Sequence, residues 1–333
     1  MAERIERLPQ LLDRKLYKTG QTRGADNDEI FQNRVSRNCT VLIPFEHYSA
    51  VIKSMGSEVF ENGFIVLVKP EHYFTDNGSA LAAAGLTLGV DAVVFYQTRQ
   101  QWRTFNPEHF KWTPASSRKA PLNGQYVARV AGTTTGDGAG ERINHGYTTT
   151  DLKGAGVRIY EYASKANIDA ARLQLETLFW RCHDSAEVVI ANGMTAKGAE
   201  TRRVAIFAAA EAGKLLDNTK LRNSRLVDAE HSTICPLCLE RISAADFFSR
   251  VAQAAGRETH DLTVTTVSLF HIKELRVGEF GHRPYNLGWG HHHCNVVVKD
   301  SGIDATLMWM SQVISRNVSA GYLLKEKSGA SGS

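Results

Sequence analysis

Two short pairs of potential metal ligands constrain this chain more than any other feature. Cys235 and Cys238 are separated by two residues, and so are His291 and Cys294. Thiolates and imidazoles are the ligands that Zn²⁺ prefers, and two such pairs on separate turns can close a tetrahedron around one ion. The segment between them is too small to bury much core by itself, so we expect these four residues to bind one structural Zn²⁺.

The residues around these pairs follow a definite order. An expected strand carries His271, a glycine-bearing loop follows, and then come Asn286, the second ligand pair and Asn295. This segment resembles the HNH family, the ββα-metal nucleases. The resemblance implies a zinc-stabilised ββα-metal (HNH) nuclease module in which His271 deprotonates the attacking water, Asn286 braces the loop and Asn295 holds a divalent metal against the scissile phosphate.

One position departs from the pattern of that family. Relatives usually carry Asp or His as a metal ligand directly before the catalytic histidine, and here that residue is Phe270, which cannot bind metal. The resemblance therefore implies that the catalytic metal, Mg²⁺ with Mn²⁺ as a substitute, is held by Asn295 together with Glu274, His282 or a residue from elsewhere. The zinc and this ion would then have separate roles, since soft and hard ligands select different metals.

Each of these residues taken alone has a simpler explanation. A lone His271 is more often a hydrogen-bonded strand histidine than a base, and Asn286 or Asn295 singly indicates only a turn. The three histidines at 291–293 could form a surface tract. The ordered set is what favours a nuclease site.

Length and composition favour a globular chain of two or more domains, because 333 residues with 43% hydrophobic content can bury a large core. No apolar run approaches the ~20 residues of a transmembrane helix, and residues 1–20 lack the apolar centre of a secretory signal. We therefore expect a cytoplasmic protein with no membrane partner. Five cysteines, two of them outside the ligand set, fit a reducing compartment better than a disulfide framework.

Apolar, β-branched runs at 40–44, 64–68 and 91–96 are each followed by a segment that can form a helix. This alternation predicts an α/β or α+β N-terminal domain with a sheet under helices. Further helices are predicted at 3–18 and 201–216, the latter with Val204 and Ala208 inward. Another is predicted to begin with Asn167 as its N-cap, and one capped by Ser243 is predicted to end near Gly256.

We expect the chain to divide into two domains and a tail. Residues 1–230 would form a DNA-recognition domain with an N-terminal arm at 1–38 and a long loop at 131–156. Residues 231–327 would form the zinc-bound HNH nuclease domain, and 328–333 a disordered tail. The loop is rich in Gly and Thr, which is typical either of a DNA-facing segment that orders on binding or of a flexible insertion.

The net charge of +4 is only mildly basic and does not by itself indicate nucleic-acid binding. Clusters of Lys and Arg are often solvated surface, but beside a nuclease module they become candidate phosphate contacts. The candidate DNA-binding residues are Arg103, Arg142, Asn144, Arg202 and Arg203.

The chain as a whole also resembles type II restriction endonucleases of the BstXI-like group, through residues 14–44 (RKLYKTGQTRGADNDEIFQNRVSRNCTVLIP) as well as the HNH segment. That resemblance implies a site-specific endonuclease acting on double-stranded DNA at an interrupted palindrome, and a homodimer, because two-fold DNA symmetry is most simply read by two-fold protein symmetry. Two alternatives stay open. One is an HNH endonuclease that requires a methylated base, and the other is a non-catalytic zinc-containing DNA-binding protein.

Overall fold

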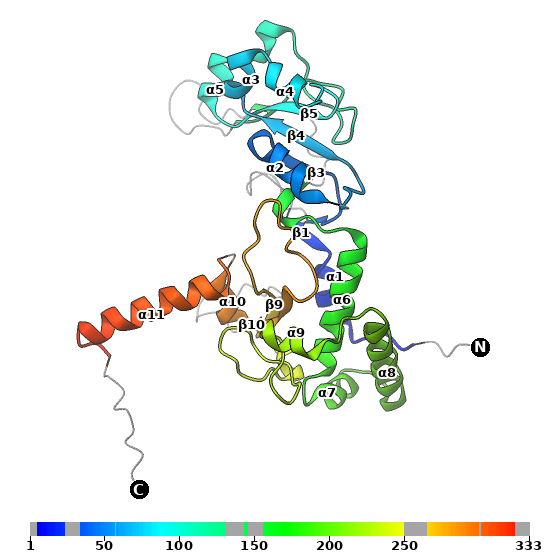
Figure 1. The fold of residues 1–333 in the computed structure, drawn as a ribbon. Coiled ribbons are helices and arrows are strands. Elements are labelled where there is room, and N and C mark those ends of the chain that lie inside the picture. The colour runs from blue at the N-terminus through cyan, green and yellow to red at the C-terminus, as the bar shows by residue number, and fades with distance from the viewer. Residues whose placement is uncertain are drawn as a thin grey trace.

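The computed structural model describes residues 5–23, 34–56, 58–130, 143–145, 156–249, 265–299 and 301–323. Figure 1 shows a β-sheet with its helices at one end of the molecule and a mainly helical body with a two-stranded hairpin at the other. We call residues 40–158 the sheet part, and the described residues of 5–23 and 159–323 the metal part. No helix among the described residues is both long and apolar enough to cross a bilayer.

The sheet part contains a six-stranded, mostly parallel sheet with the order β7-β6-β5-β4-β3-β8. Only β7 is antiparallel to its neighbour. The strands are β3 (Val41–Pro44), β4 (Phe64–Val68), β5 (Ala92–Tyr96), β6 (Tyr126–Val130), β7 (Ile143–His145) and β8 (Val157–Arg158). The three strands predicted from β-branched runs are β3, β4 and β5, so the expected mixed α/β class is confirmed for this part.

Helices connect successive strands of this sheet: α2 (Phe45–Met55), α3 (Pro70–Asp76), α4 (Ser79–Ala83), α5 (Arg99–Thr104) and the 3₁₀ helix η1 (Pro107–Phe110). Side chains alternate along a strand, so each strand has two apolar faces to bury. In β4, Val66 and Val68 pack with Leu81 of α4, whereas Ile65 and Leu67 pack against the other side with Leu122.

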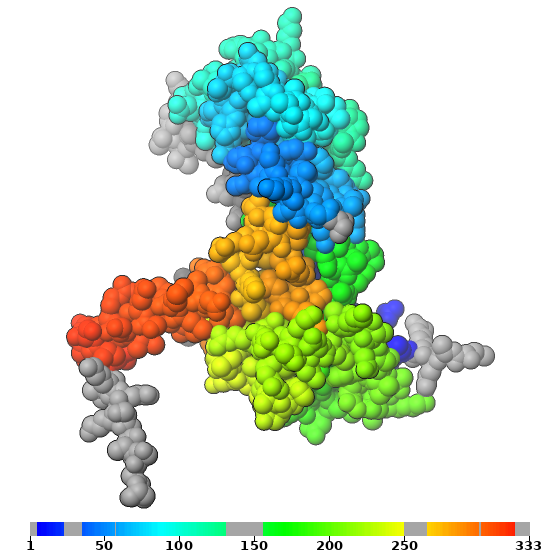
Figure 2. Space-filling view, in the orientation of Figure 1, coloured from blue at the N-terminus to red at the C-terminus, as the bar shows by residue number. Residues whose placement is uncertain are grey.

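The metal part is built from helices around a short hairpin. Its elements are α1 (Gln10–Lys18), β1 (Gln21–Arg23), η2 (Ile159–Glu161), α6 (Lys165–Trp180), α7 (Ser185–Ala191), α8 (Ala196–Ala212), α9 (Asn218–Asn223), η3 (Ala244–Phe247), β9 (Val267–His271), β10 (Leu287–His291), α10 (His292–Val298) and α11 (Ile303–Ser319). Strand β1 pairs with β2 (Arg34–Ser36), which leads into the sheet part. Figure 2 shows the segment after β9 lying between the two parts, where Phe280 packs near Phe60.

One apolar core unites the metal part across the domain boundary expected at residue 230. It contains Leu12 of α1, Leu175 of α6, Leu226, and Phe270 and Trp289 of the hairpin. The indole of Trp289 also donates to the carbonyl of Leu175 at 2.8 Å. Helix α1 and residues 164–230 therefore share a core with the segment that carries the predicted zinc ligands, and residues 217–233 contain α9 and buried side chains rather than a domain boundary.

Several helix predictions were wrong in detail. The helix expected at 3–18 begins only at Gln10 among the described residues. The N-cap of α6 is Ser164, whose hydroxyl accepts from the backbone N–H of Asn167, the residue that was predicted to be the cap. Helix α8 begins at Ala196, five residues before the predicted start, and its Val204 is 57% exposed. Helix α8 is rich in alanine, so its apolar residues lie on every side and the pattern could not select the buried face.

The expected long loop at 131–156 is not irregular throughout, because Ile143–His145 forms β7 against β6. Its remaining residues up to 155 lie outside the described residues, as do the tail at 328–333 and the end of the helix expected near Gly256. The helix predicted after Ser243 was wrong in length and type: Ser243 is the N-cap of the short 3₁₀ helix η3, which ends at Phe247. The N-terminal arm expected at 1–38 contains α1, whose Leu12 and Leu16 are buried in the core of the metal part.

Candidate metal centre and active site

The four predicted zinc ligands converge on one point. The ligand atoms of Cys235, Cys238, His291 and Cys294 all lie within 4.8 Å of one another. Cys238 Sγ and His291 Nδ1 are 3.3 Å apart. Within the described residues, no other three His, Cys, Asp or Glu side chains gather in this way.

The local backbone explains how each pair is presented. After Cys238 the chain turns back through Leu239, which has φ +64° and donates its N–H to the carbonyl of Cys235 at 2.9 Å. The second pair lies where β10 ends at His291 and α10 begins, so one turn of helix brings Cys294 to the same side. A tight turn and a strand–helix junction thus supply two ligands each.

The donor set fits Zn²⁺. Burial and the neighbouring thiols raise the pKa of Cys294, and burial raises the pKa of Cys238. Three thiols so close together cannot all ionise without a cation between them, whereas a zinc ion stabilises the thiolates. Cys235 and Cys294 are also part of the apolar core, so the site is enclosed on its inner side.

The hairpin beside this centre consists of β9 and β10, antiparallel, with His271 opposite Leu287 and Val267 opposite His291. Helix α10 follows β10 directly. Two glycines in β10 permit close packing, because a Cβ at Gly288 would lie 2.2 Å from Leu226 and one at Gly290 would lie 2.4 Å from the Phe270 ring. Phe270 is fully buried, and it is therefore a core residue.

Asn286 holds the loop between the two strands. Its Oδ1 accepts from the N–H of Lys273 at 2.8 Å, and its Nδ2 donates to the carbonyl of Gly281 at 2.7 Å. The carbonyl of Asn286 accepts from the N–H of Ile272 at 3.0 Å. These bonds connect the start, the middle and the end of the loop, so its shape depends on this one amide.

His271 and His282 form a pair at the end of β9. His271 Nε2 lies 3.2 Å from His282 Nδ1, and His282 Nε2 lies 2.8 Å from the carbonyl oxygen of Thr19. Burial, with the charge of Arg37, lowers the pKa of His271 to about 3 and the pKa of His282 well below its usual range. Both rings are therefore neutral at neutral pH.

The residues expected to hold the catalytic metal do not form one cluster with His282. His282 is 1% exposed and both of its nitrogens are occupied. Asn295 donates from Nδ2 to Ser268 Oγ at 3.3 Å, which leaves its Oδ1 available. Glu274 forms an ion pair with Arg276 at 2.7 Å and lines a cavity of about 360 Å³ after β9 that also contains Asp304.

The predicted DNA-binding residues lie in different environments. Arg103 is exposed on α5. Arg142 lies outside the described residues, and of Asn144 only the backbone is described, in β7. Arg202 binds Glu176 at 2.6 and 3.0 Å, and Arg203 binds Glu200 at 2.9 Å. The last two guanidinium groups would have to give up a carboxylate before binding phosphate.

Three residues of this site were missed in the sequence: Thr19 and Arg37, which both approach His282, and Asp304. Arg37 Nε donates to the same Thr19 carbonyl at 3.1 Å that His282 contacts. Thr19 lies 263 positions from His282, so no local pattern could connect them. Asp304 lies near the segment after β9 because the neighbouring Ile303 donates its N–H to the carbonyl of Ile272.

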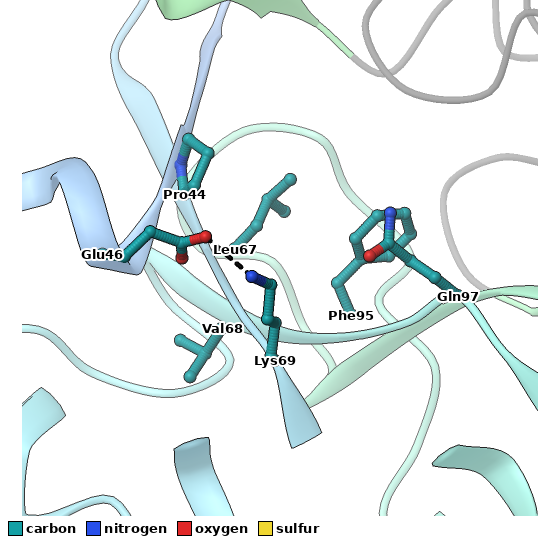
Figure 3. A pocket seen from close by; sticks show the side chains of 7 residues that line it. All are labelled: Pro44, Glu46, Leu67, Val68, Lys69, Phe95 and Gln97. Atoms are coloured by element: carbon teal, nitrogen blue, oxygen red, sulfur yellow. Dashed lines mark hydrogen bonds and ion pairs between the residues drawn. The ribbon is translucent and has the colours of Figure 1, made fainter. Parts of the chain in front are cut away.

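A second cavity lies at the carboxyl ends of β3, β4 and β5. Figure 3 shows Glu46 and Lys69 forming an ion pair beside it, with Phe95 and Gln97 on another side. Ligands often bind at this edge of parallel sheets. The cavity of about 190 Å³ is smaller than usual ligand pockets, which span about 300–1,000 Å³, and it has one aromatic side chain, so we assign it no ligand.

Comparisons with known proteins give one family. The family model of the BstXI restriction endonuclease matches residues 14–292, a span that ends before Cys294. A search of the curated proteins finds no match. Among solved structures, a chain titled "Crystal structure of a type II restriction endonuclease" aligns with 47% of this chain and 57% of its own length, at 15% identity and a TM-score of 0.29. The match thus spans little more than half the length of that neighbouring chain.

Proposed function

The chain belongs to the BstXI restriction endonuclease family, and we propose that it is a type II enzyme that cuts double-stranded DNA at specific sites in the cytoplasm. His271 would act as the general base, and one divalent metal would assist. The observation that carries this proposal is the β9–β10–α10 arrangement beside the zinc ligands, with His271 at the end of the first strand and Asn295 on the helix.

The hydrogen bonds of the histidine pair indicate which nitrogen would take the proton. The carbonyl of Thr19 can only accept a hydrogen bond, so His282 Nε2 carries the proton and donates it. Because the ring is neutral, His282 Nδ1 is unprotonated. His282 Nδ1 therefore accepts a hydrogen bond from the N–H at His271 Nε2. This leaves His271 Nδ1 as the unprotonated, basic nitrogen. We propose that His282 orients His271 rather than binding metal, as the third member of a catalytic triad orients its histidine.

The low pKa of His271 in the free protein makes it a weak base, although it is in the neutral form that a base requires. A DNA phosphate bound nearby would favour the protonated imidazolium and raise that pKa. His271 Nδ1 would then accept the proton of water as the water oxygen attacks phosphorus and the P–O3′ bond breaks.

Oxygen donors close to strand β9 fit a Mg²⁺ ion. Proteins commonly hold Mg²⁺ with one or two carboxylates together with water and substrate phosphate. We propose Asn295 Oδ1 and the carboxylates of Glu274 and Asp304 as the groups from which its ligands come. The ion would stabilise negative charge on the phosphate and the leaving oxygen. Glu274 would have to release Arg276 to take part.

We further propose that the sheet part reads the DNA sequence, with Arg103, Arg142 and Asn144 as contacts. Arg103 is exposed on α5 at the end of the molecule far from α11 (Figure 1). We do not retain Arg202 and Arg203 in this role, because each is already bound to a glutamate.

A homodimer is part of the proposal, and α11 is the surface we assign to it. This helix projects from the body of the molecule (Figure 1). Leu307 and Ile314 lie two helical turns apart on one side and are 36% and 53% exposed, and Trp309 is 53% exposed. Exposed apolar groups along a projecting helix would be stabilised by burial against a second copy.

Replacing both Leu307 and Ile314 with glutamate should convert the dimer to a monomer, because each charge would be buried in the interface. Light scattering after size-exclusion chromatography measures the change. Ser315→Glu adds a charge at an exposed position of the same helix that is rotated by about 100° from Ile314; it serves as the control and should remain dimeric. A wild-type protein that is monomeric at micromolar concentration would contradict the proposal.

Digestion of a plasmid library, followed by sequencing of the ends, tests the function as a whole. We expect Mg²⁺-dependent cuts at one defined sequence in unmodified DNA. Cuts only in methylated DNA would favour the modification-dependent alternative. An absence of cutting with either Mg²⁺ or Mn²⁺, in a zinc-loaded protein that binds DNA, would favour the non-catalytic alternative.

A further inference from the structure

A cavity of about 580 Å³ opens between α9, the loop after β9 and the start of α11. Its lining includes four basic side chains, Lys220, Arg225, Lys273 and Arg283, and one acidic side chain, Asp304. Figure 1 shows α9 beside the hairpin, and Figure 2 shows the two segments meeting on the visible face. We propose that this cationic groove binds the sugar-phosphate backbone of the DNA next to the cleaved bond, an inference that rests on the proposed function.

Of the four cations that line the groove, only Lys220 has a carboxylate partner among the described residues, Asp217 at 3.9 Å. Within the part of the chain that the structure describes, Arg225, Lys273 and Arg283 take part in no ion pair. By contrast, Arg202 and Arg241 of the same part form ion pairs with Glu176 and Asp228. Uncompensated cations that line one hollow favour a ligand with several negative charges.

The groove is also held rigidly relative to the candidate base. The N–H of Lys273 donates to Asn286 Oδ1, and the carbonyl of Arg283 accepts from the N–H of Asn286 at 3.2 Å. Lys273 lies two residues after His271, and Arg283 lies directly after His282. Asn286 therefore fixes the backbone of two groove residues, each within two positions of one of the histidines.

Arg225 is fixed from the other side of the groove. It lies in the turn after α9 with φ +58°, and its N–H donates to the carbonyl of Arg222 at 2.8 Å. The next residue, Leu226, is buried against Gly288 of the hairpin. The backbone that carries this cation is therefore ordered before DNA binds, so binding phosphate does not have to order this turn.

The test compares two double variants of the full-length, zinc-loaded protein without divalent metal. Arg225→Gln with Arg283→Gln removes two groove charges but keeps polar side chains that can donate hydrogen bonds. Arg203→Gln with Lys165→Gln removes two charges that already have carboxylate partners. Fluorescence anisotropy gives the affinity for a cognate and an unrelated duplex between 50 and 300 mM salt, roughly the range in which counterion release is measured.

We expect the groove variant to weaken binding to both duplexes alike and to lower the slope of log K against log salt by about 1.8, which is two phosphate contacts at about 0.9 each. The control variant should keep the wild-type slope. An unchanged slope in a folded groove variant, while the wild type binds and cuts DNA, overturns the groove and leaves the proposed function intact. A wild type that neither binds nor cuts DNA overturns both.

Discussion

Replacing Cys238 with serine should release the zinc and unfold the metal part. Cys238 is the exposed member of the ligand set, so this change removes a ligand with little loss of packing. Structural zinc sites contribute an apparent free energy of about 10–16 kcal/mol, whereas whole domains are stable by about 5–15 kcal/mol. Loss of the ion should therefore exceed the stability that the core supplies.

Metal analysis and thermal unfolding measure this result, with and without a strong chelator. Wild-type protein should contain about one zinc per chain, on the rule for closed tetrahedral sites, and chelation should reproduce the effect of the variant. Cys39→Ser is the matched control, because Cys39 is a partly buried thiol outside the site. A folded, active preparation without zinc would show that the four residues do something else.

Replacing His271 with alanine should lower the cleavage rate by roughly 10²-fold or more, the usual contribution of a general base. Zinc content and DNA binding should stay unchanged, because His271 is neither a zinc ligand nor part of the cationic groove. Single-turnover cleavage of a cognate duplex measures the rate. Cutting at the wild-type rate would show that this segment is not an HNH active site.

Asn295→Ala provides the contrast to that variant. If Asn295 holds the catalytic metal, part of its lost activity should return at high Mg²⁺ or with Mn²⁺. His271→Ala should show no such recovery, because added metal does not replace a missing proton acceptor. Equal recovery in both variants would contradict the separate roles that we propose for the two residues.

Local features of the sequence were sufficient for part of this description. Runs of β-branched residues predicted β3, β4 and β5, because alternating apolar side chains must be buried on two faces of a sheet. The spacing of Cys235, Cys238, His291 and Cys294 predicted a group that the folded chain brings within 4.8 Å. Short-range spacing carries this information because two ligands on one turn have almost fixed relative positions.

Features that depend on distant residues were decided only by the tertiary structure. Arg202 lies on α8, a helix with apolar residues on all sides, so the sequence alone does not show which way it faces. Packing of α8 against α6 determines that Arg202 faces Glu176 rather than solvent. Likewise, the sequence pattern separated residues 164–230 from the zinc segment, yet Leu175 and Trp289 share one core. Burial is a property of both surfaces in contact, and a linear pattern describes only one of them.

The candidate site shows the same division. The sequence by itself determined which residue types could do the chemistry: two ligand pairs, a strand histidine and two asparagines in order. Only the tertiary structure decided that Phe270 is core, that the ring nitrogens of His282 face Thr19 and His271, and that the unpaired cations Arg225 and Arg283 line one groove. The reason is physical, because orientation and charge compensation arise from contacts between segments that lie far apart along the chain.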